Sequence, residues 1–306
     1  MKRFVCVLNF CNAVYLMNNF TDLIQKSYDR EVERYLNASD MQHENLRNLL
    51  QLAAVPLKKL NYEKPDLDIS VLDIGCGAAS VVGELSALDW LNPIKYLGID
   101  ISPKMIDAAN SLYKGENIQF KVANANDIPV QDNFADFVIS NSAIHWANQE
   151  KLGLSVSPIF DEIKRASADG GVVAVSIAAQ GTGLSLLEVF RKLIDEERSE
   201  FGIDEDIYSE DPVGVMSAHH VVNELLRIEL EVIDVRLQYE PILFSNASEY
   251  MNAVRAYGFE MFTASIIEQR KEIFWSRLEN LFVNGVESGP YRHNQYMIYA
   301  VARNTL

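Results

Sequence analysis

The chain has 306 residues, of which 48% are hydrophobic and 23% are charged, a balance typical of a globular protein. Its 43 Asp and Glu residues outnumber its 27 Lys and Arg residues, so the formal net charge is -16 at pH 7. A charge of this sign repels phosphate backbones and argues against nucleic acid as the partner.

The cysteines and the N-terminus bear on where the protein works. Three cysteines without CxxC or Cys/His spacing indicate neither a disulfide framework nor a metal site, so we expect a reducing, cytoplasmic location. The apolar run at the N-terminus looks like a signal peptide, but Asn9 and Asn12 interrupt it and no cleavage site comes after it. It is also too short to span a membrane. We expect residues 1–19 to be a dispensable leader, or an extension upstream of a true start at Met17, and we expect no membrane partner.

Residues 20–178 carry the first set of predicted elements. Residues 20–56 have apolar positions at spacings of three and four, which predicts helix, and Pro56 with the polar stretch NYEKPDLD separates them from the next segment of the chain. Short apolar runs then alternate with helical patterns, which predicts a parallel sheet with helices on both faces and a ligand site at the carboxyl ends of its strands. The expected strands are 70–75, 94–101, 118–123, 134–142 and 170–178, and the expected helices are 80–91, 102–113 and 156–167.

The pattern changes after Gly183. We expect helices over 184–201, 246–259 and 265–282, a solvated acidic loop over 204–211, and strands over 228–244 and 295–303. These last strands complete the sheet as an antiparallel pair, while the helices form a lid. The predicted organisation is a helical cap over 20–66, a core over 67–182, and substrate-cap helices with the last strands over 183–306. The fold class is α/β, a doubly wound and mostly parallel sheet.

The stretch VLDIGCGAAS, residues 71–80, ends a strand in two glycines. Glycines at this place let a ligand approach the backbone, and the helix after them offers free N–H groups. A dinucleotide fingerprint would need a third glycine where Ser80 stands, and the carboxylate of Asp73 suits a cationic amine better than a pyrophosphate. Both observations argue against a nicotinamide dehydrogenase.

Three blocks, VLDIGCGAAS, YLGIDIS and NANDIPVQDNFADFVISNSAIHW, together resemble the class I S-adenosylmethionine-dependent methyltransferases over roughly residues 70–180. The resemblance implies a Rossmann-like fold, S-adenosyl-L-methionine as cofactor and S-adenosyl-L-homocysteine as product. The family usually has an acid where Asn124 stands. The implied contacts to the cofactor are Gly75 and Gly77 along its length, Asp73 at its amino-acid end, Asp100 at both ribose hydroxyls, Ile101 on the adenine face, Asn124, Ala125 and Asn126 along the adenine edge, and Asn141 beside the methionine.

The block SNSAIHWANQ is similar to that of methyltransferases acting on small carboxylic acids, among them trans-aconitate, malonyl-carrier-protein and juvenile-hormone-acid methyltransferases. The resemblance implies that Tyr28, as a catalytic residue, and Tyr35 cover the methyl group. It also implies that His145 and Trp146 face that group, with packing under the sheet as the alternative. Arg255 is a candidate partner for an acceptor carboxylate, and the alternative is a solvated helix residue.

We therefore expect methyl transfer from S-adenosylmethionine to a small molecule. A carboxylate is the first choice of acceptor because it is already ionised at neutral pH and needs no base. The alternatives are N- or O-methylation of an aromatic secondary metabolite with His145 as base, and a non-catalytic module that keeps the cofactor pocket. The sequence leaves a homodimer open.

Overall fold

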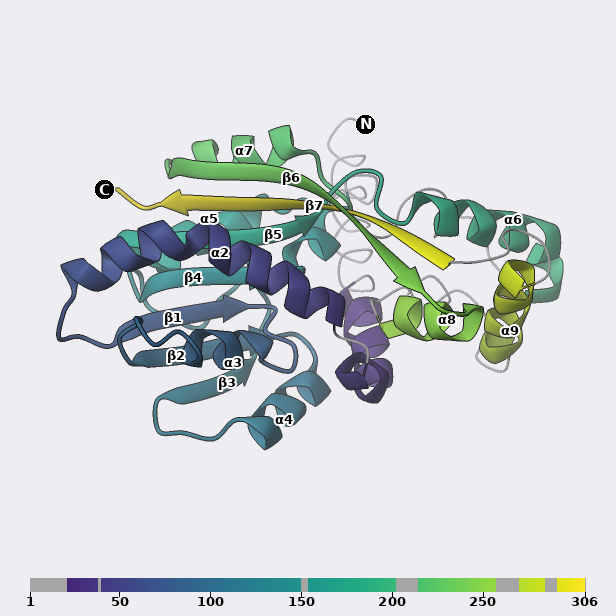
Figure 1. Cartoon of the computed structure of the whole chain (residues 1–306), viewed down its shortest axis with the longest axis horizontal. Coiled ribbons are helices and arrows are strands. Elements are labelled where there is room, and N and C mark those ends of the chain that lie inside the picture. The colour runs from purple at the N-terminus through teal and green to yellow at the C-terminus, as the bar shows by residue number, and fades with distance from the viewer. Residues whose placement is uncertain are drawn as a thin grey trace, which may run out of the picture.

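The structure is a computed structural model, and it describes residues 21–37, 40–149, 154–201, 214–256, 270–283 and 291–305. The expected N-terminal leader and the acidic loop over 204–211 lie outside these residues. Within the described part, seven strands form one sheet in the order β3-β2-β1-β4-β5-β7-β6 (Figure 1).

The sheet combines a parallel core with an antiparallel end. The strands from β1 to β5 pair in parallel, and β7 runs antiparallel to both β5 and β6. The predicted parallel sheet with an antiparallel final pair is therefore confirmed. The strands are β1 (Ile69–Ile74), β2 (Ile94–Asp100), β3 (Ile118–Val122), β4 (Ala135–Asn141), β5 (Ser167–Ala178), β6 (Glu231–Phe244) and β7 (Tyr291–Arg303).

Helices cover both faces of this sheet. On one face, α2 and α3 contribute to a core that also reaches α6, α8 and α9, whereas α5 and α7 form the core on the other face. A further helix over residues 21–37, the lid helix, lies beyond the carboxyl ends of the parallel strands (Figure 1). The other helices are α2 (Asp40–Glu63), α3 (Ser80–Ser86), α4 (Pro103–Leu112), η1 (Ile144–Ala147), α5 (Ser157–Ala166), α6 (Leu184–Phe201), α7 (Ala218–Arg227), α8 (Ala247–Ala256) and α9 (Lys271–Leu281).

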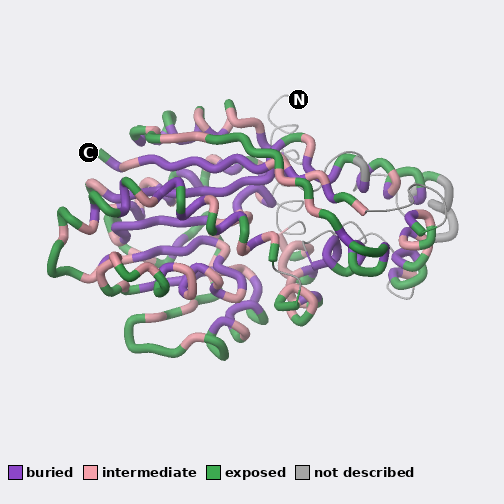
Figure 2. The backbone as a smooth tube through the Cα atoms, in the orientation of Figure 1, coloured by how far each residue is buried: buried purple, intermediate pink, exposed green. Residues whose placement is uncertain are grey.

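The central strands are buried on both faces, as Figure 2 shows. Successive side chains of a strand point to opposite faces, so neighbouring residues enter different cores. In β1, for example, Val71 packs with α2 and α3, whereas Leu72 packs with α5. Such two-sided burial explains why these strands read as continuous apolar runs in the sequence.

Two boundaries differ from the sequence prediction. The helix end expected at Pro56 is wrong, because α2 continues through this proline to Glu63, within the polar stretch NYEKPDLD that separates it from β1. Leu57 and Leu60, beyond the proline, are 1% and 2% exposed, and their burial offsets a proline cost of about 3 kcal/mol within a helix. The helix expected over 80–91 ends at Ser86.

Side chains cap the starts of two helices. The N–H of Met105 donates to Ser102 Oγ over 3.1 Å at the start of α4, and the N–H of Glu249 donates to Asn246 Oδ1 over 2.8 Å at the start of α8. In the described ranges, no helix has both the length and the apolar composition needed to cross a membrane.

Candidate active site

A cavity of about 340 Å³ lies at the carboxyl ends of the parallel strands, where the sheet and the lid helix both line it. Its lining follows the order of the strands across the sheet. The end of β2 and the turn after β1 form one part, the end of β4 with η1 forms the middle, and the end of β5 with the start of β7 forms the rest. The lid helix and the first turns of α2 cover it.

The turn after β1 needs glycine at two positions. Gly75 has a φ of +72°, and a Cβ on it would overlap the Cβ of Ala143. Gly77 has a φ of +51°, and a Cβ there would come 3.3 Å from the Tyr35 hydroxyl. Both glycines line the cavity, so the backbone itself forms that stretch of wall.

Asp100 closes β2 with its carboxylate held at the cavity wall. The N–H of Gly77 donates to Oδ2 over 2.9 Å, and the N–H of Ser102 donates to Oδ1 over 2.8 Å. Burial raises the pKa of this carboxyl, and the two N–H groups oppose that rise. Each oxygen keeps a further lone pair, so the group can accept from two neighbouring hydroxyls.

The loop after β3 also reaches the cavity. Asn124, Ala125 and Asn126 line it, as does Ile101 after β2. Asn124 Oδ1 accepts from the N–H of Asn126 over 3.0 Å, so this oxygen shapes the turn that presents the loop. A second lone pair on the oxygen is available to another donor.

Asp73 lies behind the glycine turn and is not among the residues that line the cavity. Its side chain is fully buried and accepts a hydrogen bond from the Tyr96 hydroxyl. Burial raises the pKa of Asp73 to about 7, although the Tyr96 hydrogen bond opposes the rise. Any contact of this carboxylate with the amino-acid end of a cofactor remains a prediction.

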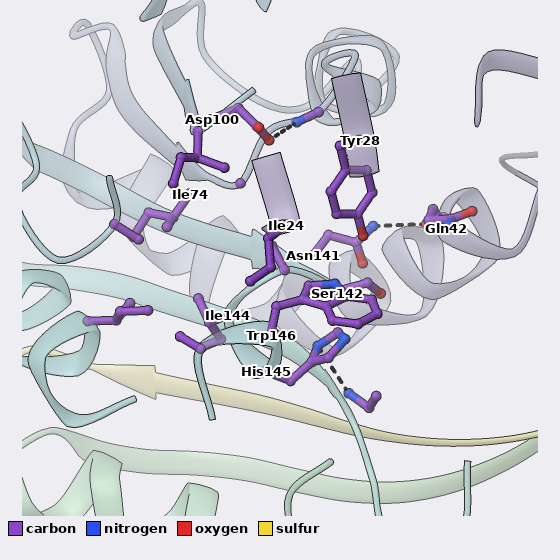
Figure 3. Close-up of a pocket in the computed structure, with 18 of the residues that line it drawn as sticks. Ile24, Tyr28, Gln42, Ile74, Asp100, Asn141, Ser142, Ile144, His145 and Trp146 are labelled. Atoms are coloured by element: carbon purple, nitrogen blue, oxygen red, sulfur yellow. Dashed lines mark hydrogen bonds between the residues drawn. The ribbon is translucent and has the colours of Figure 1, made fainter. Parts of the chain in front are cut away.

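Asn141 stands in the middle of the cavity and joins the sheet to α2. Its Nδ2 donates to the backbone oxygen of Gln42 over 2.9 Å (Figure 3), and its Oδ1 accepts from Ser176 Oγ over 2.7 Å. Both ends of the amide are therefore fixed. These bonds set the first turns of α2 against the carboxyl end of β4.

His145 and Trp146, on η1, line the cavity next to each other with ring centroids 5.1 Å apart (Figure 3). The N–H of Ala178 donates to His145 Nδ1 over 3.5 Å, which leaves the proton of a neutral ring on Nε2. Burial lowers the pKa of His145 to about 3. His145 is therefore a neutral hydrogen-bond donor at physiological pH.

Tyr28 and Tyr35 reach the cavity from the lid helix. Their rings meet edge to face with centroids 6.3 Å apart, and Tyr28 makes a second edge contact with Trp146, also at 6.3 Å. Burial and the nearby carboxylate of Asp100 raise the pKa of both phenols. Both stay protonated at neutral pH.

Arg255 is the predicted site residue that the structure sets apart from the others. It lies on α8, outside the cavity lining, and its guanidinium makes a bidentate pair with Glu272 of α9 over 2.7 and 3.1 Å. It also lies 3.7 Å from Glu31 of the lid helix and over the ring of Trp275. Pairing of Arg255 with an acceptor carboxylate stays a prediction.

The polar wall at the β7 end of the cavity was not predicted from the sequence. Gln42 and Asn45 come from α2, and His293 and Gln295 come from β7. Gln295 Nε2 donates to Asn45 Oδ1, and Asn45 Nδ2 donates to Ser142 Oγ, both over 3.2 Å. The sequence did contain one signal for this wall. Gln42 and Asn45 are three residues apart, on the same helix face as the buried leucines of α2.

The cavity suits a nucleoside linked to an amino acid. The backbone of Gly75 and Gly77 forms one stretch of its wall. On one side of this stretch lies the carboxylate of Asp100, which can accept from a ribose diol, and on the other lies the fixed amide of Asn141. These features would accommodate S-adenosylmethionine, and the contacts expected of Asp100 and Ile101 with the nucleoside and of Gly75 and Asn141 with the methionine stay predictions. Among the described residues, no group of three or more His, Cys, Asp or Glu side chains is placed to hold a metal ion.

Comparisons with known proteins point the same way. The family named "Methyltransferase domain" matches residues 72–175. A malonyl-(acyl-carrier protein) O-methyltransferase from Marinomonas sp. (strain MWYL1) is 31% identical over 160 residues, which cover 52% of this chain and 53% of that protein. A second enzyme of that name, from Hamiltonella defensa, is 28% identical over 174 residues, covering 57% and 58%. The chain thus spans little more than half the length of these curated relatives.

The fold has counterparts among solved structures. A candidate methyltransferase from Bacillus halodurans C-125 superimposes with a TM-score of 0.50 over 82% of this chain and 99% of that one. Sequence identity to it is 16%, so this likeness concerns the fold alone. Residues 72–175 thus match a methyltransferase domain, and in this core and in its fold the chain is similar to class I, Rossmann-like methyltransferases.

Proposed function

We propose that the protein methylates a carboxylate of a small molecule, with S-adenosylmethionine as the methyl donor. The observation that carries this proposal is the state of His145, whose Nδ1 accepts from the Ala178 N–H and whose pKa is lowered to about 3. A ring in this state donates a hydrogen bond from Nε2 and is a poor base at neutral pH. An acceptor that is already ionised needs no base.

The order of the strands supports a division of the cavity into two parts. Asp100, Gly75 and Asn141 lie at the carboxyl ends of β2, β1 and β4, and they would hold the cofactor along that line. The next strands, β5 and β7, would then border the acceptor, with His145 between the two parts. When bound, S-adenosylmethionine supplies a methyl group on a positively charged sulfur.

The protein's own part in such a reaction is to align and to exclude water. His145 Nε2–H would hold one carboxylate oxygen of the acceptor and leave the other free to attack. Trp146, Tyr28 and Tyr35 would wall the site with aromatic rings, and the two phenols, being protonated, would not compete for the methyl group. His293, whose pKa burial lowers to about 4, would present a second neutral ring to the acceptor.

The sequence relatives agree with this choice in their chemistry, because both are named for O-methylation of a malonyl group. The substrate of this chain is a separate question, since the match covers little more than half of each relative. Carrier-bound and free carboxylic acids both belong in a screen. The acceptor class, not the identity of one acceptor, is what the proposal states.

The test is the pH dependence of methyl transfer in a panel of acceptors at saturating S-adenosylmethionine. For a carboxylic acid, kcat/KM should stay flat between about pH 6 and 9, because its pKa of about 4 leaves it ionised throughout. His145→Gln, which keeps a neutral N–H donor, should retain activity within roughly tenfold. A base at this position would instead contribute about 10²- to 10⁴-fold.

The result against the proposal is equally clear. Turnover of a phenol or an amine, with a rate that rises with pH and collapses in His145→Gln, would favour the aromatic acceptor with His145 as base. Tight binding of S-adenosylhomocysteine without turnover of any acceptor would favour a non-catalytic cofactor-binding module. A native melting temperature for His145→Gln is the control in both cases.

A further inference from the structure

The side chain of Asp29 attaches the lid helix to the nucleoside end of the cavity. The hydroxyl of Ser102 donates to Asp29 Oδ1 over 2.6 Å, and the N–H of Lys104 donates to the same oxygen over 3.3 Å. Asp29 therefore supplies a carboxylate to the first turn of α4, where N–H groups are free and the helix dipole favours negative charge. A residue of the lid helix thus serves as part of the cap of a core helix.

Ser102 joins this contact to the carboxylate assigned to the ribose. Its N–H donates to Asp100 Oδ1 over 2.8 Å, while its hydroxyl donates to Asp29 and accepts from the N–H of Met105. Ser102 is fully buried, and all three of its polar contacts point in fixed directions. A movement of the lid helix that breaks the bond from Asp29 therefore disturbs a residue that holds Asp100.

The charges on the two carboxylates strengthen this link. The negative charge of Asp29 is one of the influences that raise the pKa of Asp100. Hydroxyl groups that donate to Asp100 spread its negative charge and so reduce the repulsion between the two groups. A ribose diol at Asp100 would therefore favour the arrangement in which Asp29 stays close.

The position of Asp29 also decides where the lid aromatics lie. Asp29 comes directly after Tyr28, and Tyr28 packs edge to face on Trp146 of η1. Tyr35, two turns further along the same helix, stands over Gly77. Holding Asp29 at α4 therefore holds both rings over the cavity.

We propose that Asp29 is a positioning residue that couples closure of the lid helix to a ligand on Asp100, with Ser102 as the connection. A nucleoside with a free ribose diol is the chemical class that would close the lid. The inference rests on the proposed function in one respect, that Asp100 receives the ribose of the cofactor. It adds that occupancy of this carboxylate and closure of the lid are one linked event.

The experiment measures trypsin cleavage of the lid in the full-length protein, with and without S-adenosylhomocysteine. Cleavage after Lys26, Arg30 and Arg34 is identified by mass spectrometry, because these sites lie on the lid helix. Proteolysis tracks the population of the open form when opening is fast. In the wild type, the ligand should slow lid cleavage by about tenfold or more, the effect of one charge-assisted hydrogen bond.

Asp29→Ala should bind S-adenosylhomocysteine in calorimetry yet gain less than about twofold protection, because the link to Ser102 is cut. Asp29→Asn keeps an acceptor oxygen and should recover most of the protection. Glu33→Ala changes an exposed carboxylate on the same helix and should behave as the wild type. Methylthioadenosine, which carries the ribose diol without the amino acid, should also protect the wild-type lid.

Two results would overturn the inference while leaving the cofactor assignment intact. The first is a wild-type lid that is cleaved at the same rate with saturating ligand. The second is full protection in Asp29→Ala. Absence of any S-adenosylhomocysteine binding to the wild type would instead contradict the proposed function itself. If Asp29→Ala does not fold, Ser102→Ala takes its place, because it removes the hydroxyl partner of Asp29 and keeps the N–H that donates to Asp100.

Discussion

Replacing Asp73 by Asn should change how the stability of the protein depends on pH. Asp73 is fully buried, accepts one hydrogen bond from Tyr96, and has an Oδ1 atom without a hydrogen-bond partner among the described residues. Burial raises its pKa from 3.8 to about 7. Between these values the folded protein keeps the proton that the unfolded chain releases, so the free energy of unfolding falls as the pH rises.

The size of this effect follows from the two pKa values. The raised pKa of Asp73 lowers the free energy of unfolding by about 1 kcal/mol at pH 4.5 and by about 4 kcal/mol at pH 8. The difference between the two pH values is about 3 kcal/mol. The amide of the Asp73→Asn variant cannot ionise, and its oxygen can still accept from Tyr96. The free energy of unfolding of the variant, relative to that of the wild type, should therefore rise by about 3 kcal/mol from pH 4.5 to pH 8.

Urea unfolding of both proteins at the two pH values measures this gain. An unpartnered amide NH₂ group in the variant adds a cost that is the same at every pH, so the change with pH is the quantity to compare. Asp107→Asn, at an exposed position on α4, is the matched control and should show the same difference from the wild type at both values. A difference for Asp73→Asn that also stays constant within about 0.5 kcal/mol would refute the reasoning.

Four further substitutions have expected outcomes. Asp100→Ala should weaken binding of S-adenosylhomocysteine by about 2–4 kcal/mol, roughly 30- to 900-fold, and unchanged affinity in calorimetry would remove this residue from the site. Gly75→Ala places a methyl group against Ala143 at a positive φ and should cost about 2–4 kcal/mol of unfolding free energy, so a wild-type melting temperature would contradict the turn geometry. Arg255→Gln should cost about 3 kcal/mol because it breaks a largely buried ion-pair cluster, whereas Glu272→Gln, at a side chain that is 77% exposed, should cost less than about 1 kcal/mol. Equal losses in the last two variants would mean that the pair with Glu272 alone stabilises α8 against α9.

The parts of the fold that local chemistry controls could be predicted from the sequence. Ser102 before a proline marks a helix start wherever it stands, and the glycines of the turn after β1 imply a close approach of a ligand to the backbone. The continuous apolar runs of the strands predict burial on both faces of a parallel sheet. Pro56 misled the prediction because burial of the residues after it outweighs the local cost, and local chemistry does not reveal that burial.

The β7 end of the site could not be derived in this way. Asn45 and Gln295 meet only because β7 lies next to β5 and α2 crosses that part of the sheet. Asp73 and Arg255 show the converse difficulty. Each has a residue type that suits a ligand. The pleat of β1, however, turns the Asp73 side chain toward Tyr96 at the back of the turn, and the packing of α8 on α9 pairs Arg255 with Glu272. Residue type is visible in a sequence, whereas the direction of a side chain depends on contacts distant in the chain.

The place of β7 in the sheet has a consequence for how the protein is made. Among the described residues, the last strand, β7, lies between β5 and β6, so β6 has no strand beside it until β7 has been synthesised. The lid helix is synthesised before α8 and α9, yet its Glu31 lies 3.7 Å from Arg255 of α8, which pairs with Glu272 of α9. Pairings this distant in the chain are slow to form, and they leave β5 with an open edge during translation. A ribosome-bound chain that stops before residue 291 should therefore hold an incomplete cavity and depend on chaperones that shield strand edges.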